Sequence, residues 1–171
     1  MIDDKAIDDH FHHGEIVAQR HWGTASLWDA SRRRRLLWHA IPEEFHARIE
    51  AAPFFFLSTS GCDGRCDCSF KGGGPNLVRV LEPRRIAFPD FDGNGAFMSL
   101  GNIIENPFAG LLFIDFADGA RLRVNGRAAI HETGQFRDLF PHASRVVVVD
   151  IEEVVPNCAS HIPRLVIAAT T

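Results

Sequence analysis

Apolar and polar residues change their spacing near Pro53, and this change divides the chain into predicted elements. Between Pro42 and Ala52, apolar residues recur every three to four positions, and Glu43 and Glu44 stand in the first turn, which predicts a helix that Pro53 ends. Beyond Pro53 the spacing shortens and turn residues recur at strand-length intervals, which indicates antiparallel β structure. Strands are expected at residues 54–60, 65–70, 76–82, 84–89, 109–116, 120–131 and 145–155. Seven short strands favour a barrel or a sandwich.

Glycine marks the connections between these strands. Residues 61–64 and 118–119 contain the glycines that tight hairpins need for positive φ, so both segments are predicted to be hairpin turns. One helix is expected among the strands, at residues 96–105, and it follows a glycine-rich loop at residues 91–95. Glycine lets a ligand approach the backbone, and the first amides of a helix attract anions. This junction is therefore a predicted phosphate site.

Residues 1–40 are polar and contain all three tryptophans, which predicts an arm that packs on a body formed by residues 41–171. The basic run Arg32–Arg35 is interpreted as the solvated side of a short helix, because no second basic cluster with interleaved aromatics follows it. Histidines at positions 10, 12, 13 and 21 have no spacing that matches a metal site. No metal is expected in the arm.

Composition narrows the class of protein. The chain has 171 residues with 46% apolar content, enough for one core, and its net charge of −4 gives no general attraction to nucleic acid or anionic lipid. It has no secretion signal and no apolar run near the roughly 20 residues of a spanning helix, so a cytoplasmic protein without a nucleic-acid or membrane partner is expected. Cysteines 62, 66, 68 and 158 are expected to be reduced thiols, since their spacing differs from the paired ligands of structural zinc sites.

A long central segment then resembles a known superfamily. The stretch DGRCDCSFKGGGPNLVRVLEPRRIAFPDFDGNGAFMSLGNIIENPFAGLLFIDF, followed by RLRVNGRA, is similar to FMN-binding proteins of the pyridoxamine 5′-phosphate oxidase superfamily. The pieces FHHGEIVAQRHWG and NCASHIPRL agree with one branch of it. The resemblance implies a mainly β fold, a six-stranded antiparallel split barrel with flanking helices, and a homodimer with FMN between the subunits.

The implied activity is that of an FMN-dependent oxidoreductase with a small-molecule substrate or electron donor. The alternative is a protein without turnover that binds a flavin, a deazaflavin or haem, or that transfers electrons. Neither the residues nor the resemblance identifies a catalytic acid or base.

Candidate cofactor-binding residues follow from strand alternation and from the resemblance. Period-two alternation places Asp67, Ser69 and Lys71 on one face of their strand, and this polar face is the predicted flavin face. Cys66, Cys68 and Phe70 share the other face. The resemblance implies that further residues hold the phosphate and ribityl chain: Phe88, Asp90, Asn94, Ser99 and Asn102. Arg123 stands on a basic strand face that either faces water or meets the neighbouring subunit's phosphate, and the resemblance implies that Arg164 approaches the flavin across the dimer.

The sequence departs from the oxidases that act on pyridoxamine phosphate. Those enzymes carry a Ser-Arg-Lys phosphate clamp near the glycine-rich loop, whereas residues 93–99 of this chain read GNGAFMS. Lys71, or an arginine of the other subunit, would have to supply the missing charge, because an anion desolvated without a cation is costly. The departure argues against a vitamin B6 phosphate as the substrate. The residues themselves also favour a dimer, apart from the resemblance. Phe54, Phe55 and Phe56 cannot all turn inward, so the outward-facing rings need cover from the arm or from a second copy.

Overall fold

The computed structural model describes residues 11–157 and 159–166, which form parts of two compact units, residues 1–38 and 39–171. The first unit contains α1 (His13–His21), the 3₁₀ turn η2 (Ala25–Leu27) and α2 (Ala30–Leu36). The basic run lies on α2, as predicted, but Arg33 is buried and donates a hydrogen bond to the carbonyl of Trp28. His10 lies outside the described residues.

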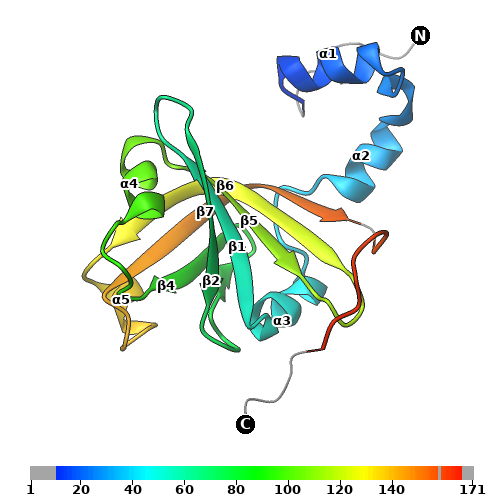
Figure 1. Cartoon of the computed structure of the whole chain (residues 1–171). Coiled ribbons are helices and arrows are strands. Elements are labelled where there is room, and N and C mark those ends of the chain that lie inside the picture. The colour runs from blue at the N-terminus through cyan, green and yellow to red at the C-terminus, as the bar shows by residue number, and fades with distance from the viewer. Residues whose placement is uncertain (1–10, 158, 167–171) are drawn as a thin grey trace. The chain divides into compact units, whose positions relative to one another are not determined.

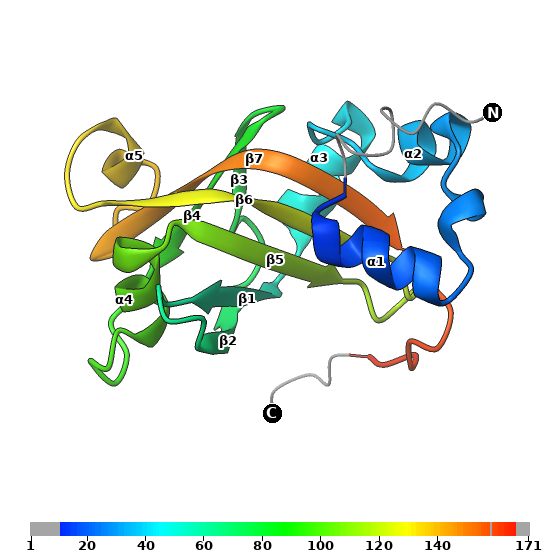
Figure 2. The same ribbon diagram turned by 90° about the horizontal axis from the view of Figure 1, so that it is seen from above.

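The second unit begins with α3 (Glu43–Ala51) and contains one antiparallel sheet (Figures 1 and 2). Its seven strands have the spatial order β2-β1-β5-β6-β7-β4-β3. The strands are β1 (Phe54–Ser60), β2 (Cys66–Gly72), β3 (Arg79–Glu82), β4 (Arg85–Asp90), β5 (Phe108–Ile114), β6 (Arg121–His131) and β7 (Arg145–Asn157). The mainly β antiparallel prediction is confirmed, with seven strands instead of the six that the resemblance implied.

The sheet curls around its core, because side chains of strands that are not neighbours meet inside it. Phe55 on β1 packs edge-on against Phe88 on β4, with 5.0 Å between the ring centroids, although three strands separate β1 from β4 in the sheet. Strand alternation explains the sorting of the three consecutive phenylalanines. Phe55 is fully buried, whereas Phe54 and Phe56 lie on the opposite face, where they form an aromatic cluster with Phe70.

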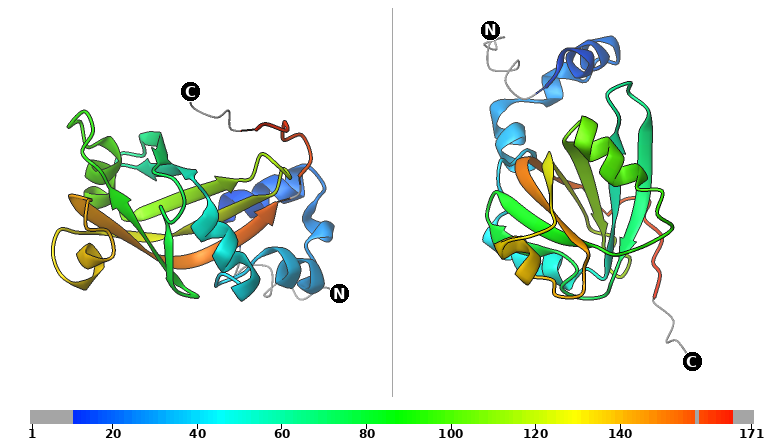
Figure 3. Two further views of the ribbon diagram at one scale, coloured as in Figure 1. Left: turned by 90° about the horizontal axis from the view of Figure 1, so that it is seen from below. Right: turned by 90° about the vertical axis from the view of Figure 1, so that its left-hand side faces the viewer.

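Two further helices connect strands. Helix α4 (Met98–Glu105) joins β4 to β5, and the short α5 (Gln135–Asp138), which the sequence pattern did not predict, joins β6 to β7. α3 and α4 lie at opposite ends of β1 (Figures 1 and 3). α4 begins two residues later than predicted because Gly95 and Phe97 have φ values of 75° and 49°, which a right-handed helix cannot include.

The predicted hairpins are present. The amide of Gly61 donates to the carbonyl of Arg65, and Gly64 and Gly119 have φ values of 81° and 73°. β3 is shorter than predicted because Asn76 takes a left-handed φ of 64° and its amide bonds to the carbonyl of Glu50 instead of a strand. In the part of the chain that the structure describes, no helix has the length and apolar content to cross a membrane.

Candidate functional site

A pocket of about 220 Å³ lies where β2, the end of β4 and the first turn of α4 meet. The glycine-rich loop that follows β4 forms its rim. Six of the residues predicted from the sequence line it: Asp67, Ser69, Lys71, Asp90, Asn94 and Ser99. The pocket thus brings together most of the predicted polar groups from two separate stretches of the chain, residues 67–71 and 90–100.

Strand β2 supplies one wall through its alternation. Asp67, Ser69 and Lys71 are half-buried, whereas Cys66, Cys68 and Phe70 are exposed on the other side, as predicted. The register explains the orientation, because Ser69 stands opposite the buried Leu57 of β1. Residues directly opposite each other in an antiparallel pair share a face of the sheet. The inward face of β1 therefore fixes the polar triplet toward the pocket.

A short chain of hydrogen bonds joins β2 to α4. The hydroxyl of Ser99 donates to Asp67 Oδ2 at 2.8 Å, and its oxygen lies 3.0 Å from Ser69 Oγ. A hydroxyl has only one proton to donate, so Ser69 is the donor in the second bond. Ser99 is buried. Asp67 retains lone pairs that can accept hydrogen bonds from hydroxyl groups, because an ionised carboxylate only accepts hydrogen bonds.

Asp90 contacts two cationic side chains at the pocket. Its Oδ2 accepts a hydrogen bond of 2.9 Å from Arg145 Nε, and its Oδ1 lies 4.0 Å from Lys71 Nζ. Arg145 Nη2 also donates to Asp92 Oδ1 at 2.9 Å, and its guanidinium lies over the ring of Phe97 at 4.8 Å. The hydrogen bond to Asp90 is the main cause of a raised pKa for Arg145. Sequence analysis did not find Arg145 as a site residue.

The sequence of this unit matches one family. Residues 41–158, more than half of the chain, match the family model described as pyridoxamine 5′-phosphate oxidase. The chain belongs to the pyridoxamine 5′-phosphate oxidase family. Among curated proteins, none matches the sequence. The superfamily assignment made from the central segment is therefore confirmed.

Several solved structures of other proteins have the same fold. An FMN-binding protein from Syntrophomonas wolfei has a TM-score of 0.53 at 12% identity, covering 85% of this chain and 97% of that one. A protein from Lactobacillus delbrueckii named after pyridoxamine 5′-phosphate oxidase has a TM-score of 0.54 at 23% identity, covering 68% and 94%. HupZ from Group A Streptococcus has a TM-score of 0.55 at 14% identity, covering 67% and 92%. At these identities the likeness shows the fold.

The other predicted site residues of this pyridoxamine 5′-phosphate oxidase family member lie outside the pocket lining. Phe88 is buried in the core against Phe55, because both faces of β4 are covered at that position. Asn102 donates to Thr59 Oγ1 at 3.1 Å and so holds α4 to β1. Arg123 donates to Asn157 Oδ1, and Arg164 donates to the carbonyl of Ala117. The structure thus does not bring these four residues together with the six that line the pocket.

Asn94 has a structural role as well as a place in the lining. Its Oδ1 accepts a hydrogen bond of 3.0 Å from the amide of Ala96, which stabilises the turn before α4. Asparagine often supports loops in this way, with its side chain bonded to the backbone two residues on. Its amide nitrogen remains a candidate donor to a ligand in the pocket.

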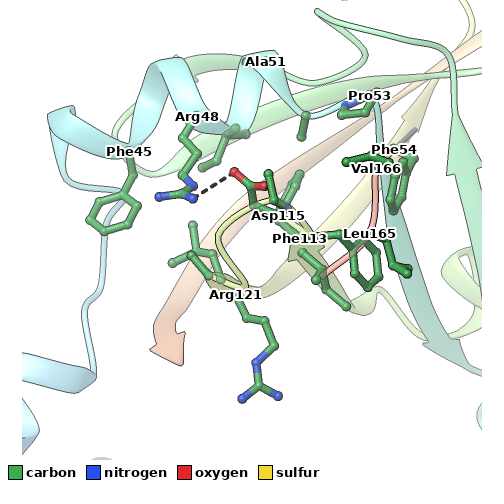
Figure 4. Close-up of a pocket in the computed structure, with 17 residues that line it drawn as sticks. Phe45, Arg48, Ala51, Pro53, Phe54, Phe113, Asp115, Arg121, Leu165 and Val166 are labelled. Atoms are coloured by element: carbon green, nitrogen blue, oxygen red, sulfur yellow. Dashed lines mark hydrogen bonds and ion pairs between the residues drawn. The ribbon is translucent and has the colours of Figure 1, made fainter. Parts of the chain in front are cut away.

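A second cavity, of about 490 Å³, lies between α3, the start of β1, the β5–β6 turn and residues 165–166 (Figure 4). Its lining is mostly apolar, and Arg48 reaches across it to an ion pair with Asp115 at 2.9 Å. Arg48 also pairs with Asp118, whose pKa is lowered by a backbone hydrogen bond from Ala120 and by Arg48 itself. Two carboxylates therefore engage the guanidinium of Arg48.

Cys62, Cys66 and Cys68 are free, exposed thiols, and Cys158 lies outside the described residues. The carboxylate of Glu105 accepts a hydrogen bond from the backbone amide of Cys62, and Glu105 raises the pKa of the Cys62 thiol. Within residues 11–157 and 159–166, histidine, cysteine and acidic side chains form no group able to hold a metal ion.

Proposed function

We propose that the protein binds FMN in the pocket at the start of α4 and acts as an oxidoreductase. The observation that carries the proposal is the convergence of Lys71, Ser69 and Ser99 on the glycine-bordered first turn of α4. Lys71 supplies a cation and the helix start supplies backbone amides, which together suit a phosphate group. The family and the FMN-binding relative from Syntrophomonas wolfei support the same cofactor.

Different parts of the pocket suit different parts of FMN. Lys71 is the lining cation and would hold the phosphate. Asp67 accepts hydrogen bonds only and would repel a phosphate, but it suits the hydroxyl groups of a ribityl chain. Asn94 adds amide N–H donors that can bond to either part, whereas Ser69, whose proton is donated to Ser99, can accept a hydrogen bond from a ribityl hydroxyl. The donor set of this chain therefore fits the cofactor, with fewer cations than the oxidases with a Ser-Arg-Lys clamp.

The proposed site is shared between two copies of the chain. A pocket of about 220 Å³ is smaller than the roughly 300–1,000 Å³ usual for small-molecule sites, so it would hold only part of the cofactor. Its rim carries Phe91, Phe97 and Met98, which are 47%, 49% and 63% exposed. A second copy that covers this rim would complete the site and bury its apolar side chains. This supports a homodimer with FMN at the interface.

The residues of the pocket would bind and orient the cofactor and leave the chemistry to it. When bound, FMN supplies hydride or electron transfer. Among the described residues, no histidine or cysteine lines this pocket, and the sequence contains no tyrosine. Asp67, Lys71 and Asp90 are the charged side chains of the lining, and we assign Asp67 and Lys71 to cofactor binding.

The same lining also suits a second function, that of a flavin-binding protein without turnover. Because histidine, the side chain that titrates nearest neutral pH, is absent from the described lining, the pocket offers no obvious proton donor for a substrate. A steady-state assay with a reduced nicotinamide and a series of acceptors separates the two functions. Turnover supports the oxidoreductase, and a bound flavin that no donor reduces supports the binding protein.

The cofactor itself is tested by the visible spectrum of freshly purified protein together with mass identification of the released ligand. FMN is the expected ligand. Replacing Lys71 by alanine should lower the amount of FMN retained, because the pocket loses its lining cation. The matched control is Arg65→Ala, which removes an exposed cation paired with Asp63 in the β1–β2 hairpin. A deazaflavin or haem spectrum would overturn the FMN proposal.

A further inference from the structure

We propose that Arg145 is a positioning residue that neutralises Asp90 and thereby leaves Lys71 available to the cofactor's phosphate. This inference rests on the proposed binding of FMN and adds a residue that neither the sequence pattern nor the family assignment identifies. It concerns the balance of charge between Lys71 and Asp90, which line the pocket, and Arg145, which pairs with Asp90 from outside the lining.

Asp90 stands between two cations that it contacts unequally. Arg145 Nε lies 2.9 Å from Asp90 Oδ2, within the range of a charge-assisted hydrogen bond. Lys71 Nζ lies 4.0 Å from Asp90 Oδ1, which is too long for a hydrogen bond. The Asp90 and Arg145 side chains are 11% and 18% exposed, so solvent screens this pair only weakly. Asp90 therefore pairs mainly with Arg145. The N–H donors of the Lys71 ammonium remain available to another partner.

The sheet fixes this pairing. Asp90 and Arg145 are opposite residues at the end of the β4–β7 ladder, and the amide of Ser144 donates to the carbonyl of Asp90. Lys71 comes from β2, at the far end of the strand order, and reaches Asp90 only because the sheet curls. The pair Asp90–Arg145 is thus built into the backbone register, whereas the contact of Lys71 depends on a flexible side chain.

Without the guanidinium, the charge balance of the pocket would change. Asp90 is nearly buried, and a buried carboxylate without a partner is costly. Lys71 is the nearest remaining cation and would move onto Asp90. A phosphate would then meet a cation already paired with a carboxylate, and Asp90 would add repulsion. We therefore expect that loss of Arg145 weakens binding of the phosphate group in particular.

Arg145 also contacts the loop before α4, through Asp92 and the ring of Phe97. A purely structural role in holding this loop would affect every ligand of the pocket alike. The two roles therefore separate when FMN is compared with riboflavin, which has the same ring and ribityl chain but no phosphate.

The test measures the affinity of the full-length protein for FMN and for riboflavin by quenching of flavin fluorescence. With Arg145→Gln, FMN affinity should fall about tenfold or more, which is about 1.4 kcal/mol, while riboflavin affinity changes little. In the double variant Arg145→Gln/Asp90→Asn, most of the FMN affinity should return, because Lys71 no longer has a carboxylate to pair with. The control is Arg85→Gln, which removes a similar Nε–Oδ1 pair with Asp150 on the same two strands, outside the pocket lining.

Equal losses of FMN and riboflavin that Asp90→Asn does not reverse would overturn the inference and leave Arg145 a role in loop structure only. If Arg145→Gln does not fold, Asp90→Asn alone gives the answer. This variant should bind FMN at least as tightly as the native protein, and a selective loss of FMN affinity would overturn the inference. A native protein that binds neither flavin would instead refute the proposed function, and the inference with it.

Discussion

Ser99, in the first turn of α4, donates a hydrogen bond of 2.8 Å to Asp67 on β2, although 32 positions separate them in the sequence. This bond joins the helix start to the polar face of an edge strand. It explains why the glycine-rich loop ends at a pocket, because the helix that follows it is held beside the polar side chains of β2. The same two residues stand among the proposed FMN ligands.

Replacing Ser99 by alanine should weaken both the fold and the site. Asp67 would lose its donor, and Ser69 would lose its acceptor in a buried position. The free energy of unfolding should fall by about 1–3 kcal/mol, measured by urea denaturation without cofactor. FMN affinity should fall as well. Ser58→Ala, at an exposed position of β1, is the matched control and should change neither quantity.

The aromatic cluster of Phe54, Phe56 and Phe70 should support dimerisation. Phe70 is 62% exposed and stacks on Phe54 with 5.2 Å between ring centroids. A charge placed there would be costly to bury in an interface. Phe70→Asp should therefore shift the protein from dimer to monomer in sedimentation equilibrium. Leu139→Asp changes an exposed apolar residue just after α5 and should leave the dimer intact. A native monomer at micromolar concentration would contradict the shared site.

The ion pairs of Arg48 should make stability depend on pH. A backbone hydrogen bond from Ala120 and the side chain of Arg48 lower the pKa of Asp118, so its contribution is present above the ordinary aspartate pKa and lost as the pH falls through the lowered pKa. Arg48→Gln should therefore destabilise the protein most at neutral pH, with a smaller difference from the native protein below a pH of about 3.9.

The pairs of Arg48 are partly exposed, so high salt should also reduce the difference. Urea denaturation across this pH range, at low and high salt, measures both effects. A difference in stability that is the same at neutral and acid pH would contradict the assignment.

Gly126 should tolerate no side chain. It follows the register shift between Asn125 and Gly126 in the β6–β7 ladder, and a Cβ there would lie 2.1 Å from the carbonyl oxygen of Asp150. Gly126→Ala should destabilise the protein by at least about 2 kcal/mol, because the backbone must shift. Gly101→Ala on α4 meets open space and should stabilise it by about 0.5–1 kcal/mol. Thermal unfolding of the two variants provides the comparison.

The sequence predicts the strands well because alternation is a local signal. Residues 54–60 coincide with β1, and the polar triplet of β2 faces the pocket as expected. Phe88 shows where the signal ends. Four consecutive residues of β4 are buried, so period-two alternation does not tell which of them faces a ligand.

Arg145 shows a second limit. Its place beside Asp90 depends on the register between β4 and β7, because the two residues are 55 positions apart in the chain. No local pattern encodes that pairing. The left-handed backbone of Phe97 is equally hard to predict from the local sequence. Only the loop geometry around Phe97 requires this conformation, which delays the start of α4.

The central claim is that FMN binds where Lys71 faces the first turn of α4. Isothermal titration of FMN into the ligand-free native protein and into Lys71→Ala tests it most directly. We predict one FMN per chain for the native protein and an affinity at least about tenfold lower, about 1.4 kcal/mol, for the variant. Equal affinities for the two proteins, or no heat of binding with the native chain, would contradict the account.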